Sequence, residues 1–250
     1  MGDQTSIAVW VALTFVAAGL VKGTIGMGLP TVAMGVLSLV MAPAAAAAML
    51  VIPSFVTNVW QLIAGPAFGA LLRRLATMML GVCAGTVLGI GVLTGQSASL
   101  AGAALGAVLS AYGAVGLAAP RFTVSPNVER WLSPLIGILT GLVTGATGVF
   151  VIPAVPYLNS LGLAKEDLIQ ALGLSFTVST VALAVALGLS GQFQLTTAGG
   201  SLLAVIPAMV GMLIGQRVCG SLRPDVFRKW FFVGLVVLGV YMMLRVLLPK

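Results

Sequence analysis

The sequence predicts an all-α polytopic membrane protein, and three observations support this fold class. Hydrophobic residues make up 60% of the 250 positions and charged residues only 7%, whereas soluble domains carry about 25% charged residues. A transmembrane helix needs about 20 apolar residues, and uncharged runs cover residues 4–21, 23–72, 75–120, 131–164 and 168–216. Such long apolar runs exclude a transmembrane barrel, whose strands alternate between polar and apolar residues.

Turn residues and charges divide the first half of the chain into five helical elements. The first element is apolar up to Lys22, and the second follows a glycine-rich stretch that leads to Pro30. Pro43 separates the second element from the third, the turn at 65–74 separates the third from the fourth, and Gly95 precedes the fifth. We expect these helices over residues 5–22, 29–42, 44–64, 75–94 and 98–119.

The second half divides in the same way. A polar stretch at 120–130 precedes the sixth element, and a second glycine-rich stretch separates the sixth from the seventh. Turns at 162–167, 190–194 and 221–225 precede the last three elements. We expect these helices over residues 131–147, 150–161, 166–187, 197–218 and 226–247.

An internal repeat relates the two halves. A shift of 122 positions aligns residues 19–26 with residues 141–148, and five of the eight aligned positions are identical. Each copy leads into a proline, Pro30 or Pro153. The sequence therefore predicts two membrane repeats, residues 1–120 and 121–250. Because each holds five elements, an odd number, the second repeat must enter the membrane from the opposite face, which makes the repeat inverted.

The distribution of cations predicts the orientation in the membrane. Nine Lys and Arg residues fall in loops on one face and two, Arg245 and Lys250, on the other. Cytoplasmic loops carry the excess of cations, so we expect an inner-membrane protein with both termini outside the cytoplasm. The short second and seventh elements favour at least partial re-entry. If the first and second elements form a hairpin that enters and returns without crossing, and the sixth and seventh do likewise, every loop keeps its side.

The composition also excludes several classes of function. The net charge of +7 comes from cations at helix ends without a clustered basic face, so we expect no nucleic-acid binding. The chain has no histidine, which excludes imidazole metal ligands and Ser-His catalysis. The short Gly-x-Ser-Gly pattern at 188–191, typical of rhomboid proteases, therefore lacks a base. We predict no enzyme activity, no metal and no cofactor.

Both glycine-rich stretches read as a helix end, a glycine turn and a new helix start. Glycine lets a backbone approach a ligand, and a helix N-terminus presents free N–H groups with roughly half a positive charge. The paired stretches therefore predict a binding site for a small anion, with these candidate residues: Gly23, Thr24, Gly26, Gly28, Thr144, Gly145, Thr147 and Gly148. The alternative is that these glycines only allow close helix packing, as we expect for Gly81, Gly85, Gly89, Gly211 and Gly215. Such small-residue faces would also suit a homodimer.

Lys22 is the only charge within these two stretches, and the second copy has Thr144 in its place. A cation buried in a membrane is costly and usually functional, although a lysine near a helix end can also extend its side chain to the headgroups. Uncharged polar residues cluster on the third and eighth elements: Ser54, Thr57, Asn58 and Gln61, then Ser175, Thr177, Ser179 and Thr180. Among these, Asn58, Ser175 and Ser179 are candidates for donors to an anion. Interhelical hydrogen bonds of roughly 0.6 kcal/mol each are the alternative.

These features resemble the sulfite exporter TauE/SafE family, also called the toluene sulfonate uptake permease family. The features that carry the resemblance are two copies of Gly-Leu-Val-x-Gly-x-x-Gly before a proline, the ten-element inverted repeat and the near absence of buried acids. The resemblance covers essentially the whole chain. It implies a bacterial-type inner-membrane transporter of small sulfur-containing or organic anions, such as sulfite, sulfonates or sulfoacetate. Family members often carry a glycine run after the motif, where this chain has Gly26-Met27-Gly28-Leu29 and Gly148-Val149-Phe150-Val151.

The sequence thus predicts a secondary transporter for a small anion, with the lipid bilayer as its other partner and a midplane site at the two glycine-rich breaks. Two other functions remain open. A structural or assembly subunit would need the helix packing but neither Lys22 nor glycine breaks in both halves. An anion channel would need the same site residues, and flux measurements distinguish it from a transporter.

Overall fold

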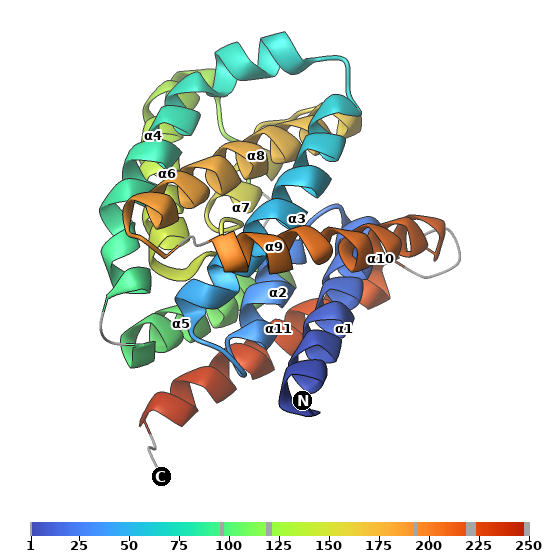
Figure 1. Ribbon diagram of the computed structural model, residues 1–250. Coiled ribbons are helices and arrows are strands. Elements are labelled where there is room, and N and C mark those ends of the chain that lie inside the picture. Colours follow the sequence, from blue (N-terminus) through green and yellow to red (C-terminus); the bar gives the residue numbers. More distant parts are fainter. Residues whose placement is uncertain (1, 96–97, 119–121, 193–194, 219–223, 248–250) are drawn as a thin grey trace.

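The computed structural model describes residues 2–95, 98–118, 122–192, 195–218 and 224–247 (Figure 1). The elements within these ranges are all helices, which confirms the predicted all-α class. Arg121, Arg223 and Lys250, which contribute to the predicted cation asymmetry, lie outside the described residues. The helices in chain order are α1 (Gly2–Ile25), α2 (Leu29–Leu37), α3 (Pro43–Ile63), α4 (Phe68–Thr94), α5 (Ala98–Ala118), α6 (Pro126–Thr147), α7 (Ala154–Asn159), α8 (Lys165–Leu189), α9 (Leu195–Leu203), α10 (Val205–Val218) and α11 (Pro224–Leu247).

Seven of the described helical stretches are long and apolar enough to cross a membrane, so the chain is a multi-pass membrane protein. They are α1, α3, α4, α5, α8, the combined α9 and α10, and α11. By contrast, α2 has 9 residues and α7 has 6, which corresponds to about 14 Å and 9 Å of rise. The hydrocarbon core is about 30 Å thick. Neither of these short helices can cross it.

Several helix boundaries differ from those expected. α4 begins at Phe68 and α6 at Pro126, because the charged residues assigned to loops continue these helices. α2 ends at Leu37, and the N–H groups of Leu39 and Val40 donate to carbonyls three residues earlier, in tighter turns that follow the helix. The expected ninth helix is divided at Ala204. Pro207 has no N–H to donate to the carbonyl four residues earlier, and its ring crowds that carbonyl.

The long helices pack in pairs, and each pair combines one helix from the first half of the chain with one from the second half. α1 packs with α10 and α4 with α6, while α3 packs with α8 and α5 with α11 (Figure 1). Gly85 and Gly89 of α4 lie against Ile138 and Leu142 of α6, respectively. The rising order on both helices shows that α4 and α6 run parallel.

The contact between α1 and α10 is built in the same way. Gly211 and Gly215 of α10 lie against the backbone of Val16 and Leu20. The partners of the two glycine pairs, Ile138 and Val16, are separated by 138 − 16 = 122 positions, the same spacing as the glycine motifs. These small-residue faces therefore pack within the chain, as the packing alternative predicts. A homodimer through other small-residue faces stays a prediction.

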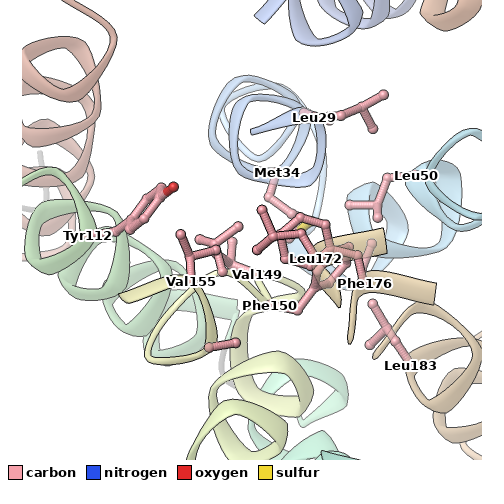
Figure 2. Packing of buried hydrophobic residues seen from close by; sticks show 14 of the residues in the cluster. Leu29, Met34, Leu50, Tyr112, Val149, Phe150, Val155, Leu172, Phe176 and Leu183 are labelled. Carbon is pink, nitrogen blue, oxygen red and sulfur yellow. The ribbon is translucent and has the colours of Figure 1, made fainter. Parts of the chain in front are cut away.

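The hydrophobic core lies where α2, the segment before α7 and α8 meet (Figure 2). Met34, Phe150 and Phe176 are buried there, and the two phenylalanine rings have centroids 5.5 Å apart. A Cβ at Gly148 would lie 3.0 Å from the sulfur of Met34. The non-helical segment after Gly148 is therefore enclosed by protein, which is required of irregular backbone within a membrane.

Candidate functional site

Two glycine turns, one in each half of the chain, have the same geometry. Gly26, after α1, has a φ of +81°, and Gly148, after α6, has a φ of +72°. The N–H of Gly26 donates to the carbonyl of Lys22, and that of Gly148 to the carbonyl of Thr144, both at 2.7 Å. A left-handed residue of this kind ends a helix, and glycine adopts it without steric cost. A helix end lies within each glycine-rich stretch, as predicted, although the first helix continues to Ile25, three residues beyond its expected end.

The segments after the two turns differ. In the first half, Gly28 has a φ of +106° and caps α2 directly. Because Pro30 lies in the first turn of α2 and has no N–H, this helix start presents fewer free donors than an ordinary one. In the second half, residues 149–151 are fully buried and lie outside any helix before α7 begins at Ala154. The glycine-poor second copy therefore forms a longer break in the helix.

Lys22 lies in the last turn of α1 and points into the protein. Only 3% of the residue is exposed. Its Nζ donates to Thr57 Oγ1 at 3.2 Å and to Asn58 Oδ1, both on α3. Asn58 Nδ2 in turn donates to Thr180 Oγ1 of α8 at 3.1 Å. This polar chain joins α1, α3 and α8, so the side chain of Lys22 does not extend to the headgroups.

No carboxylate compensates the charge of Lys22 among the described residues. The ion pair found in these parts of the chain joins Arg74 to Glu129. The two partners of Lys22 are a hydroxyl and an amide, which carry no charge. Removing a cation from water without a counter-charge costs several kcal/mol. Lys22 is therefore a buried amine whose protonated form a bound anion would stabilise.

Hydroxyl groups without partners lie on the two helices of this site. Ser54 of α3 and Ser175 and Ser179 of α8 are all fully buried, and their Oγ atoms have no hydrogen-bond partner within the described structure. Ser54 lies one turn before Asn58, and Ser175 lies one turn before Ser179. The hydrogen bond from Asn58 to Thr180 connects the two polar clusters across the contact between α3 and α8. Thr57, Thr180 and Ser54 belong to these clusters, but no feature of the sequence distinguished them from their neighbours as candidate site residues.

Three other candidate residues, Gly23, Gly145 and Thr24, make contacts with the backbone of helices. A Cβ at Gly23 would meet the backbone of α10, and a Cβ at Gly145 would meet the backbone of α4. Thr24 donates to the carbonyl of Leu20 at 2.8 Å. These residues contribute to helix packing, and a direct role in binding stays a prediction for them.

The second half has no cation at the position of Lys22. Thr144 is fully buried and donates to the carbonyl of Thr140 at 2.7 Å. Thr147 donates to the carbonyl of Val143 at 2.7 Å and accepts the N–H of Val149 at 3.2 Å. The two halves of the repeat therefore have different chemistry around equivalent turns.

A cavity of about 640 Å³ lies beside the first glycine turn. Its wall includes Met27 of that turn, Tyr112 of α5, Val155 of α7, and Arg228 and Phe232 of α11. The hydroxyl of Tyr112 donates to the sulfur of Met27 at 3.0 Å. The cavity thus reaches the turn five residues after Lys22 without including Lys22.

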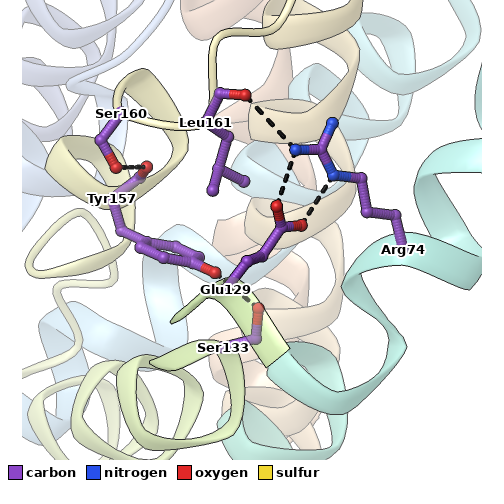
Figure 3. Close-up of polar contacts among 6 residues, drawn as sticks. All are labelled: Arg74, Glu129, Ser133, Tyr157, Ser160 and Leu161. Carbon is purple, nitrogen blue, oxygen red and sulfur yellow. Dashed lines mark hydrogen bonds and ion pairs between the residues drawn. The ribbon is translucent and has the colours of Figure 1, made fainter. Parts of the chain in front are cut away.

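The ion pair between Arg74 and Glu129 joins α4, α6 and the segment after α7 (Figure 3). Arg74 Nε and Nη2 donate to the two carboxylate oxygens of Glu129 at 2.7 and 2.8 Å, and Nη2 also donates to the carbonyl of Leu161 at 3.3 Å. Ser133 and Tyr157 share a hydrogen bond of 2.5 Å beside this pair. Sequence analysis placed Arg74 in a loop, and its partner lies 55 positions away, so no local signal could have found the pair.

Comparison with known families agrees with this architecture. The model of the sulfite exporter TauE/SafE family matches residues 11–242, which cover nearly the whole chain. No curated protein and no solved structure matches the chain. The family match, together with the multi-pass helical fold, makes this chain a membrane transporter rather than an enzyme. The chain belongs to the sulfite exporter TauE/SafE family.

Proposed function

We propose that the protein is a secondary transporter that moves a small sulfur-containing oxyanion or organosulfonate through a site at Lys22, where α1, α3 and α8 meet. The observation that carries this proposal is the burial of Lys22 without a carboxylate partner among the described residues. Ionisable residues inside a membrane are rare and usually mark a substrate pathway. A bound anion would supply the missing counter-charge.

The hydrogen bonds around Lys22 leave capacity for a ligand. An ammonium group has three donors, and Lys22 uses two of them on Thr57 and Asn58 in the described structure. The buried hydroxyls of Ser54, Ser175 and Ser179 add donors on the same pair of helices. An oxyanion with several acceptor oxygens fits this set of donors, because each oxygen can accept from the ammonium or from a hydroxyl.

The predicted inverted repeat would provide a mechanism for alternating access. α1 packs with α10, and α4 packs with α6, so each pair joins the two halves; this supports a two-fold relation between the halves. Substrate sites in transporters of this kind lie at the interface between repeats, near broken helices, and transport follows from rocking of one repeat against the other. Rocking would expose Lys22 first to one side of the membrane and then to the other.

The cavity beside the first turn is the route that we propose for substrate on the cation-rich side. Its wall includes Met27, five residues after Lys22, and Tyr112, which donates to the sulfur of Met27. The exposed Arg228 in its wall would attract anions, since positive charge lining a cleft raises the local anion concentration.

Transport can be tested with purified protein in liposomes. We expect saturable uptake of radiolabelled sulfite or methanesulfonate, accelerated by unlabelled anion inside the liposomes, because a carrier returns faster when it is loaded. Protein-free liposomes provide the background. Conductance without acceleration by internal anion would indicate a channel, and uptake at the background level for every anion tested would favour a structural subunit.

The orientation of the chain is a second testable part of the proposal. We expect both termini outside the cytoplasm and the loop between α5 and α6 inside, because the cations divide nine to two when α1 with α2, and α6 with α7, each begin and end on the same face. A C-terminal alkaline phosphatase fusion should be active and a C-terminal green fluorescent protein fusion dark. The opposite pattern would reverse the topology.

A further inference from the structure

We infer that the Lys22 site selects monoanions over dianions, because the protein supplies one uncompensated positive charge there and otherwise neutral donors. This inference rests on the proposed function and narrows its substrate class to singly charged oxyanions. It follows from the number of positive and negative charges buried around the site in the described part of the chain.

The charge balance is simple in the membrane interior. Among the described side chains, Glu129 is the other buried charged residue, and the exposed Arg74 neutralises it in a bidentate pair. Lys165 and Arg217, at the ends of their helices, are exposed. With Lys22 protonated, the described interior carries a net charge of +1, located on Lys22.

The neighbours of Lys22 add no charge and have little freedom to change partners. Thr57 donates to the carbonyl of Pro53 at 2.8 Å, and Thr180 donates to the carbonyl of Phe176 at 2.7 Å. Asn58 is held by Lys22 on one side and Thr180 on the other. The groups free to meet a ligand are the ammonium and the neutral serine hydroxyls of α3 and α8.

The consequence follows from the cost of burying charge. A monoanion on Lys22 forms a neutral pair, which is the form in which buried charges are tolerated. A dianion would leave one negative charge without a partner, and hydroxyls would stabilise that charge less than a second cation would. A sulfonate or a hydrogensulfite ion fits, whereas a sulfate or a doubly charged sulfite ion does not.

Two ligands of similar size test this selectivity on the unmodified protein. Isethionate carries a sulfonate and a neutral hydroxyl, and sulfoacetate carries a sulfonate and a carboxylate. At neutral pH we expect uptake of isethionate into liposomes at least tenfold faster than uptake of sulfoacetate, and little competition by sulfoacetate. Equal uptake of the two would overturn the charge selectivity while leaving the transporter proposal intact. If neither of these ions nor methanesulfonate or sulfite is taken up, the proposed function is itself wrong, and the selectivity falls with it.

A substitution that changes the net charge of the site tests the same inference. Asn58→Asp is nearly isosteric and places a carboxylate on the oxygen that accepts from Lys22. The introduced charge should neutralise Lys22, so we expect isethionate uptake to fall at least tenfold while the melting temperature without anion stays equal or rises. Asn127→Asp, at an exposed position in the first turn of α6, is the matched control and should transport normally. Wild-type uptake by a folded Asn58→Asp variant would contradict the inference.

If Asn58→Asp does not fold, the comparison of isethionate with sulfoacetate on the unmodified protein still decides the question. A second variant, Lys22→Met, removes the cation without adding a charge. The inference expects it to lose isethionate uptake and to gain no uptake of sulfoacetate. Retained isethionate uptake by a folded Lys22→Met variant would show that the charge of Lys22 does not select the substrate.

Discussion

Lys22→Gln should weaken anion binding and flux by roughly 30-fold or more, because removing one partner of a buried charge pair costs about 2 to 5 kcal/mol. The protein itself should fold as well as the parent or better. The ammonium is 3% exposed and lacks a carboxylate partner among the described residues, so its charge destabilises the ligand-free state. This combination of weaker binding and equal or higher stability separates a binding role from a purely structural one.

Two further variants define the effect. Lys22→Arg retains the charge and should be milder, although not silent, because the guanidinium is planar and broader than the ammonium. Lys165→Gln, at the exposed start of α8, removes a lysine outside the site and should leave flux unchanged. The measurements are uptake into liposomes and a melting series with and without anion, since a ligand that binds only the folded state raises its melting temperature. Wild-type flux in a well-expressed Lys22→Gln variant would remove Lys22 from the site.

Gly85→Ala and Gly141→Ala should each strongly reduce the amount of folded protein. A Cβ at Gly85 would meet the carbonyl oxygen of Ile138, and a Cβ at Gly141 would meet the carbonyl oxygen of Val82. Both obstacles are backbone atoms of a packed helix, so α4 and α6 would have to separate along their contact. Overpacking of this kind costs about 1 to 3 kcal/mol or more, and here it also weakens the shared contact of two long helices.

Gly91→Ala is the matched control for these variants, since it lies on the same helix as Gly85 and a Cβ there meets no atom within 4 Å. We expect its melting temperature to stay equal or to rise, because alanine is favoured over glycine in a helix by roughly 0.5 to 1 kcal/mol. The measurements are melting temperature in detergent and the monodisperse fraction in size-exclusion chromatography. Equal melting temperatures for all three variants would contradict the close packing of α4 against α6.

At the predicted anion site, the local sequence predicts the helix ends, whereas the contacts of each glycine depend on residues far away in the chain. The glycine-rich stretches predicted helix ends, and the structure has them at Gly26 and Gly148. The same stretches could not reveal that Gly23 and Gly145 lie against neighbouring helices instead. A turn glycine and a packing glycine look alike in sequence, because the difference depends on which backbone approaches the missing side chain.

The sequence by itself determined the features that depend on the chain's own composition and hydrogen bonds. In a bilayer each backbone group must find its partner within the segment, so apolar length determines the spans and glycine and proline determine where they end. The tertiary structure decided the role of charges, because it depends on contacts between distant residues. Lys22 is buried by partners 35 and 36 positions away, and Arg74 joins its helix through a carboxylate 55 positions away. A charge at a helix end can face the headgroups or the protein interior, and only the packing of the other helices determines which.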